Sequence, residues 1–175
     1  TQILLPMIDD VLAQAAVART QLDAIAFVAG PGSFTGIRIA TSVAQGLSVA
    51  LNIPVIPLSS LLVLACGAHK ETNRDEIFAC LDARREQLYW AHYSFSGAGV
   101  TPKTVIEDSL SPAQTMVAAL EADAIPYGTG VPSAYEQPAN YPHAIDGLDV
   151  AIERLTAGSY NAPGEAEAVY FRRGL

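Results

Sequence analysis

A segment rich in glycine and proline, residues 30–36, restricts the fold more than any other part of this sequence. The run before it, residues 24–29, is continuously apolar, which is typical of a strand buried on both faces. The segment after it, residues 37–51, is rich in small side chains and predicts a helix. A second short strand at 54–58 and a helix at 60–69 follow, and this order predicts an α/β fold with parallel strand pairing.

Capping residues define the ends of the helix at 37–51. Ser33 or Thr35 is placed to cap its N-terminus, and Asn52 is placed to end it. Gly46 inside the helix costs about 1 kcal/mol relative to alanine. We therefore expect this glycine to allow close packing by another element.

Residues 3–17 predict an amphipathic helix with apolar side chains on more than one side. Its main apolar face repeats at helical spacing through Leu4, Ile8, Val11, Leu12 and Ala15. Ile3 and Met7 widen this face, so the helix needs cover from two directions. The body of the chain supplies one cover. The other is either the same chain or a partner protein, and the sequence alone does not separate these alternatives.

The second half of the chain changes to an antiparallel pattern. Two apolar strands, at 77–81 and 87–93, flank a charged turn at 82–86, which predicts a β-hairpin. The further expected elements are a strand near 105–106, a helix at 111–122 that begins at Ser111-Pro112, a strand within 124–130, a loop at 131–145, a helix at 146–157 and an extended segment at 168–172.

Charge and composition limit the partners and the compartment. The formal net charge is −8, and the only neighbouring pairs of basic residues are Arg84-Arg85 and Arg172-Arg173. Nucleic-acid surfaces need clustered basic side chains, so we expect a partner to hold any RNA. No apolar run approaches the roughly 18 residues of a membrane span, and we expect no export signal. Cys66 and Cys80 lack metal-ligand spacing and predict reduced core residues of a cytoplasmic protein.

The loop at 30–36 can direct backbone N–H groups toward an anion at the start of the following helix. A phosphate-binding P-loop needs a Gly-Lys-Ser/Thr sequence, whereas this chain has Thr35-Gly36-Ile37. The glycines do not follow the dinucleotide-binding pattern either. We therefore favour a structural turn, in which Gly30 and Gly32 adopt unusual backbone angles, over a phosphate site.

Other candidate catalytic groups are few. His69, His92 and His143 are far apart, and none belongs to a helical metal-binding pair. His92 alternates with tyrosines and is expected at the surface or half buried. No Gly-x-Ser-x-Gly elbow surrounds Ser33, so a serine hydrolase is weakly supported. The turn at 82–86 has carboxylates for acid–base catalysis, but solvated ion pairs are the more common arrangement in such a turn.

Four segments carry a resemblance to a known family. The sequence at 29–39, Ala-Gly-Pro-Gly-Ser-Phe-Thr-Gly-Ile-Arg-Ile, closely resembles the hallmark segment of the bacterial TsaB (YeaZ) family. Ala44-Gln45-Gly46-Leu47 continues this likeness. The other similar segments are the first helix at 1–7, the hairpin with Asp82-Ala83-Arg84, Glu86, Tyr89 and Trp90, and the C-terminal Val169-Tyr170-Phe171-Arg172.

The resemblance implies an α/β fold of the actin/Hsp70-like class (ASKHA, ribonuclease-H-like) with two lobes. The first lobe would comprise residues 1–70 and 163–175, and the second would comprise residues 71–162. It also implies a non-catalytic partner of TsaD that works with TsaE in the N6-threonylcarbamoyladenosine (t6A) modification of tRNA and meets the tRNA only indirectly. TsaD carries the metal-binding histidines of this family, so no metal or cofactor is expected here.

The resemblance further implies one interface on the helices beside the loop, used by TsaD and by a possible homodimer. Its expected residues are Ile3, Leu4, Met7, Ile8 and Val11 on the first helix, with Arg38, Thr41, Ser42 and Gln45 on the second. The expected structural loop consists of Gly30, Pro31, Gly32, Ser33, Thr35 and Gly36. The family usually has strands upstream of these helices. We therefore expect either a first lobe without its N-terminal strands or an assembly that covers the exposed faces.

Two other functions stay open at this point. The older glycoprotease label of the superfamily suggests a peptidase, and a nucleotide hydrolase is a related alternative. Both need a nucleophile with its base, or a metal cluster. A nucleotide-binding module would instead use Gly128-Thr129-Gly130 together with the 30–36 loop, and ATP binding measured by calorimetry would favour it.

Overall fold

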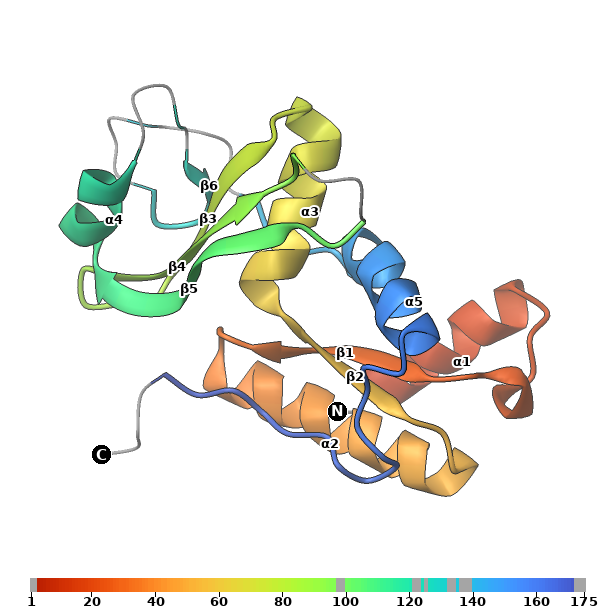
Figure 1. The fold of residues 1–175 in the computed structure, drawn as a ribbon. Helices are drawn as coiled ribbons and strands as arrows, with labels where there is room; N and C mark the ends of the chain where they lie inside the picture. Colours follow the sequence, from red (N-terminus) through yellow and green to blue (C-terminus); the bar gives the residue numbers. More distant parts are fainter. Residues whose placement is uncertain are drawn as a thin grey trace.

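The computed structural model describes residues 3–96, 100–120, 124, 126–131, 135 and 140–171. The α-helices are α1 (Leu4–Gln14), α2 (Phe34–Leu51), α3 (Ser60–Thr72), α4 (Ala113–Ala119) and α5 (Leu148–Thr156). The strands are β1 (Ile25–Gly30), β2 (Val55–Ser59), β3 (Glu76–Asp82), β4 (Gln87–Ser94), β5 (Lys103–Pro112) and β6 (Pro126–Gly128). The described residues also include the short 3-10 helices η1 (Arg19–Gln21) and η3 (Ala144–Gly147). Figure 1 shows α3 crossing between the two groups of strands.

The strands form two sheets in the described part of the chain. β1 and β2 pair in parallel, from Ile25 opposite Val55 to Gly30 opposite Ser59. The second sheet has the order β5-β4-β3-β6, with β3 antiparallel to β4 and parallel to β6. This arrangement confirms the predicted α/β class, the predicted parallel pair and the predicted hairpin.

The two faces of the first sheet meet different neighbours because side chains alternate along a strand. Phe27, Ala29 and Val55 point to α2 and are buried with Ala44 and Ala166. The alternate residues, which include Val28 and Ile56, point to the opposite face, where α5 lies. The segment before the C-terminus runs along α2 (Figure 1) and also contacts the first sheet directly, where Asn161 forms an antiparallel bridge with Val55.

Helix α3 joins the two sheets and is the most deeply buried helix. Ser59 caps it: its Oγ accepts the backbone N–H groups of Leu61 and Leu62 at 3.1 and 3.3 Å. The side chains of α3 belong to one apolar core with residues of β2, β3, β4 and α5. This core spans both sheets. The predicted division of the chain into lobes at residues 70 and 162 stays a prediction.

Several element boundaries differ from those expected. α2 begins at Phe34, three residues before residue 37. Ser111 and Pro112 do not start α4: they end β5, where they pair with Leu88 and Gln87 of β4, and the extended backbone of Pro112 keeps them there. Residues 121–123 of the expected helix lie outside the described residues. The expected loop at 131–145 ends in η3, and α5 follows it.

No helix within the described ranges is both long and apolar enough to cross a bilayer. The two cysteines, Cys66 and Cys80, are buried and free. Burial raises the pKa of the Cys66 thiol to about 11 and that of the Cys80 thiol to about 12. Their predicted place in the core is therefore confirmed by their position in the fold.

Candidate functional site

The loop at 30–36 turns the chain from β1 into α2 and is shaped by its first residues. Gly30 has a φ of +120°, a conformation that L side chains rarely adopt, whereas Gly32 has no positive φ. Pro31 is fully buried and follows a cis peptide bond. Ser33 caps α2, since its Oγ accepts the N–H of Gly36 at 3.4 Å. The predicted cap at Ser33 and the unusual backbone angle expected at Gly30 are confirmed, whereas the expectation of unusual angles at Gly32 is wrong.

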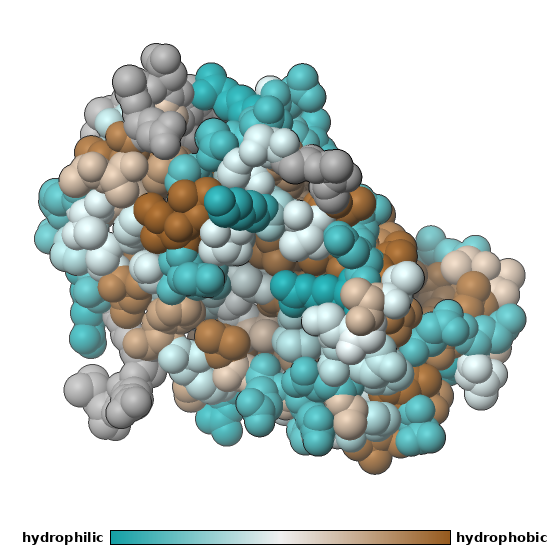
Figure 2. All heavy atoms as spheres, viewed as in Figure 1, coloured by the Kyte–Doolittle hydropathy of each residue, from teal (hydrophilic) through white to brown (hydrophobic). Residues whose placement is uncertain are grey.

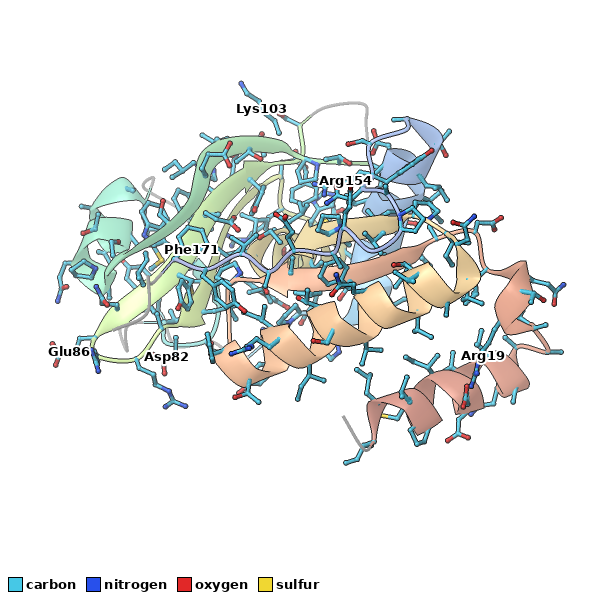
Figure 3. All side chains as sticks on the ribbon, turned by 90° about the horizontal axis from the view of Figure 1, so that it is seen from below. Arg19, Asp82, Glu86, Lys103, Arg154 and Phe171 are labelled. Atoms are coloured by element: carbon cyan, nitrogen blue, oxygen red, sulfur yellow. The ribbon has the colours of Figure 1, made fainter. Side chains whose placement is uncertain are left out.

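The C-terminal segment lies against this loop and links it to the hairpin. The Val169 N–H donates to the carbonyl of Ala29 at 2.8 Å. The next two rings point to different elements: Tyr170 lies 5.5 Å from Phe34, and Phe171 lies 5.9 Å from Tyr89. In Figure 3, Phe171 lies toward the same end of the molecule as the hairpin turn. The segment expected at 168–172 is thus extended and bonded to β1 through Val169, although Arg172 lies outside the described residues.

The polar side chains around the loop and at the hairpin make contacts within the described chain. Ser33 is exposed and its hydroxyl caps a helix. In the described part of the chain, no group of three or more His, Cys, Asp or Glu residues is arranged to hold a metal ion. At the hairpin, Arg84 lies 3.8 Å from Asp82, and both side chains are exposed. This is the solvated ion pair expected for such a turn.

The position of His92 corrects a prediction. Its ring is only 3% exposed, stacks on Phe78 at 4.0 Å and lies 2.7 Å from Glu76. Glu76 also accepts a bond from Ser94 at 2.6 Å. The alternation with tyrosines is misleading here because the second sheet is covered on both faces, by α3 on one and by α4 on the other. His92 is therefore a satisfied core residue of the second sheet.

Helix α1 has two apolar sides and contributes no buried residue. Leu4, Ile8 and Leu12 are half buried. Ile3, Met7 and Val11 form a separate stripe at i, i+4 and i+8, with exposures of 73%, 55% and 63%. Figures 1 and 3 show α1 at the edge of the molecule. We call these last three residues the outer stripe.

The predicted interface residues on α2 have different surroundings. The guanidinium of Arg38 lies 5.2 Å from the centre of the Phe34 ring. Ser42 is exposed, and these three residues line a shallow hollow of about 320 Å³. Gln45 instead donates to the carbonyl of Gly164 at 2.7 Å and so holds the C-terminal segment. Thr41 has a buried hydroxyl that finds no hydrogen-bond partner among the described residues.

Gly46 lies on the exposed side of α2, and a Cβ built on it meets nothing within 4 Å. No neighbour within the described chain therefore explains a glycine at this position. The glycine costs the helix about 1 kcal/mol relative to alanine. The missing side chain leaves room beside the helix backbone for another molecule.

An apolar groove of about 630 Å³ separates α1, β1 and α5. Val11, Ala26 and Ile152 line it from these three elements. Figure 2 shows hydrophobic residues on the side of the molecule where α5 and α1 lie. The predicted residues of α1 and α2 thus line different hollows: Val11 lines this groove, and Arg38 and Ser42 line the hollow on α2.

Sequence reasoning did not identify several residues that build this region. Phe34 and Tyr170 are exposed by 59% and 46%, and their contact joins positions distant in the sequence. Ser48 accepts the N–H of Gly164 at 3.1 Å, one turn from Gln45 on the same face of α2. The spacing of Gln45 and Ser48 is a helical i, i+3 signal, but nothing local indicates that Gly164 is their partner.

Comparisons with known proteins agree on one family. The family model described as TsaD, tRNA N6-adenosine threonylcarbamoyltransferase, matches residues 1–162. A protein from Escherichia coli (strain K12) named tRNA threonylcarbamoyladenosine biosynthesis protein TsaB is 31% identical, over 100% of this chain and 81% of its own length. The protein of that name from Haemophilus influenzae is 32% identical, over 98% of this chain and 79% of its own length. The solved structure of YeaZ from Pseudomonas aeruginosa matches with a TM-score of 0.86 and 35% identity, covering 97% of this chain and 83% of that one.

Proposed function

Because the chain belongs to the TsaB (YeaZ) family, we propose that it is a non-catalytic partner of a TsaD-type threonylcarbamoyltransferase in the t6A modification of tRNA. In this role it pairs with TsaD, works with TsaE in the cytoplasm and meets the tRNA only through its partners. A homodimer would use the same helices. The family membership supports the pathway, and the surface of the chain supports the role within it.

The outer stripe of α1 is the observation that carries the proposal. Three apolar side chains, Ile3, Met7 and Val11, are more than half exposed on a helix that has no buried residue. Burying apolar area contributes roughly 25 cal/mol per Å², and contiguous apolar surfaces of this kind mark interaction sites. Gly46 adds a second observation, because it leaves the backbone of α2 open to close approach.

The non-catalytic part of the proposal is supported by how the reactive side chains are used. Ser33 caps α2, and His92 is buried against Phe78 and Glu76. At the hairpin, the Asp82 carboxylate accepts the backbone N–H of Arg84 at 2.8 Å. Each group has a structural use, and no nucleophile with an adjacent base occurs among the described residues of the loop. A peptidase or nucleotide hydrolase finds no supporting geometry here.

A reconstituted tRNA modification assay tests this role. The chain is added to the TsaD-type and TsaE-type proteins of the same organism with tRNA, ATP and the activated threonylcarbamoyl donor, and t6A is measured by mass spectrometry of nucleosides. We expect no t6A from the chain alone and full activity with Ser33→Ala. Product formed by the chain alone, or loss of activity in a folded Ser33→Ala variant, contradicts a non-catalytic role.

A further inference from the structure

The carboxyl ends of β1 and β2 lie where the two sheets approach each other. Gly30, the last residue of β1, is the register partner of Ser59, the last residue of β2. α3 begins immediately after Ser59. In open α/β sheets, ligands bind just outside the carboxyl ends of parallel strands, so this is the place at which such a fold would hold a ligand.

In this chain, the side chain of Asp108 lies at that place. Its Oδ2 accepts the hydroxyl of Ser59 at 2.5 Å, and its Oδ1 accepts the hydroxyl of Tyr93 at 2.8 Å. Ser59 belongs to the first sheet, whereas Tyr93 and Asp108 belong to β4 and β5 of the second. One carboxylate therefore connects the two sheets, with a hydroxyl donor on each oxygen.

The backbone of β5 is irregular at Asp108. Trp90 pairs with Ser109 and His92 pairs with Ile106. Only Ala91 separates the pairs on β4, whereas Glu107 and Asp108 both lie between them on β5. One extra residue in a strand is a β-bulge, and bulges change the direction of a side chain. The bulge gives Asp108 a position that regular pairing of β4 and β5 would not produce.

The connection extends into α3. The Ser59 oxygen that donates its proton to Asp108 also accepts the N–H groups of Leu61 and Leu62. Nearby, Arg154 of α5 donates to the carbonyl of Pro57 in β2 at 2.7 Å. The start of α3 is thus fixed by hydrogen bonds that involve both sheets.

Burial makes this an unfavourable place for a charge. Desolvation raises the pKa of Asp108, while the hydroxyls of Ser59 and Tyr93 partly oppose that effect and the neighbouring Glu107 adds to it. Half-buried carboxylates with shifted pKa values are more often found at functional positions than elsewhere. An asparagine would avoid the desolvation penalty, but it has a single oxygen acceptor in place of the two carboxylate oxygens that receive the Ser59 and Tyr93 hydroxyls.

We propose that Asp108 is an internal anion that closes the junction between the two sheets and fixes their relative position without a bound ligand. It occupies the position that a small oxyanion, such as a carboxylate or phosphate, would otherwise take beside the Ser59 and Tyr93 hydroxyls. This inference concerns the shape of the molecule and is independent of the proposed pairing with TsaD. It makes the junction closed to nucleotides in the unmodified chain.

Thermal unfolding of the full chain at neutral pH, in matched concentrations of sodium chloride, formate, acetate, phosphate and Mg-ATP, tests the proposal. Asp108→Ala leaves two hydroxyls without their acceptor, and we expect its Tm to fall by roughly 3–10 °C. Formate should restore part of this loss in Asp108→Ala but should stabilise the unmodified chain no more than chloride does. Glu107→Ala, which removes the exposed neighbouring carboxylate, is the matched control and should show neither effect.

Three results would overturn the proposal. The first is a folded Asp108→Ala variant that responds to formate and acetate no more than to chloride. The second is that phosphate or Mg-ATP raises the Tm of the unmodified chain as much as it raises the Tm of Asp108→Ala. The junction of the unmodified chain would then be open to these anions. The third result comes from Asp108→Asn, whose side chain is closer in shape to aspartate than alanine is. This variant should fold if Asp108→Ala does not. Amide exchange at Leu61 and Leu62 should accelerate about tenfold in it, and unchanged exchange contradicts the proposal.

Discussion

The carbonyl oxygen of Val169 lies 2.7 Å from the point that a Cβ on Gly30 would occupy. The N–H of the same valine donates to the carbonyl of Ala29. Both backbone polar groups of Val169 therefore lie against the backbone at the start of the loop. Only a glycine permits this approach. The hallmark loop and the C-terminal segment are therefore one structural unit, although the sequence separates them widely.

Replacing Gly30 with alanine should destabilise the chain strongly. The φ of +120° is strained for any L side chain, and the added methyl would collide with the Val169 carbonyl. We expect a loss of at least about 2 kcal/mol in the free energy of unfolding, measured by urea denaturation. Gly32→Ala is the matched control, since the nearest described neighbour of a Cβ there, the Cδ1 of Ile37, is 3.9 Å away. Equal stability of the two variants would show that the contact with Val169 does not constrain the loop.

Gly46→Ala should separate stability from pairing. With no described residue within 4 Å of the new methyl, the helix should gain about 0.5–1 kcal/mol. If a partner packs against this face, the same methyl should weaken binding by roughly 5–100-fold. Lys103→Ala, on the far side of the molecule from α2 (Figure 3), should leave binding unchanged. A stabilised Gly46→Ala variant with unaltered affinity would exclude this face from the interface.

The stability of the chain should depend on pH through Asp108. Burial raises the pKa of Asp108 above its ordinary value of 3.8, so the protonated form favours the folded state. Its contribution is fully present below pH 3.8 and is lost as the pH rises through the folded-state pKa. The unfolding free energy of the unmodified chain minus that of Asp108→Asn should therefore fall as the pH rises across this window. A difference that increases with pH would mean that the hydroxyl bonds outweigh desolvation.

The two cysteines should be unreactive in the folded chain. With pKa values of about 11 and 12, Cys66 and Cys80 form little thiolate near neutral pH, and both side chains are buried. Their alkylation by iodoacetamide should be at least about 100-fold slower than that of free cysteine and should become fast in urea. Rapid labelling of either thiol in the folded chain, detected by mass spectrometry, would contradict their assignment to the core.

Local signals in the sequence predicted the parts of the fold that depend on neighbouring residues. The apolar run before Gly30, the cap at Ser33 and the stop at Asn52, which adopts a left-handed φ of 54°, are all readable within one or two turns. The junction at Asp108 is not, because Ser59 and Asp108 are 49 residues apart and the bulge that brings them together has no sequence signature. His92 was misplaced because periodicity does not reveal that both faces of its sheet are covered.

The interface, too, could be predicted only in part from the sequence. Apolar spacing indicated that α1 needs two covers, and the structure supplies part of one, against Leu4, Ile8 and Leu12. The structure also shows that Gln45, which is expected at the interface, donates a hydrogen bond to the carbonyl of Gly164. A helical period identifies a face but does not identify what covers it. Which residues meet a partner therefore stays a prediction until binding is measured.

Calorimetric titration of a TsaD-type protein into the chain measures the proposed binding at the outer stripe of α1. A carboxylate buried in an apolar interface costs several kcal/mol, so Met7→Asp should weaken binding by at least about 100-fold. Ala13→Asp places the same charge on another exposed part of α1 and should bind like the unmodified chain. Equal affinities for all three proteins, with the folds intact by circular dichroism, would contradict binding at this stripe.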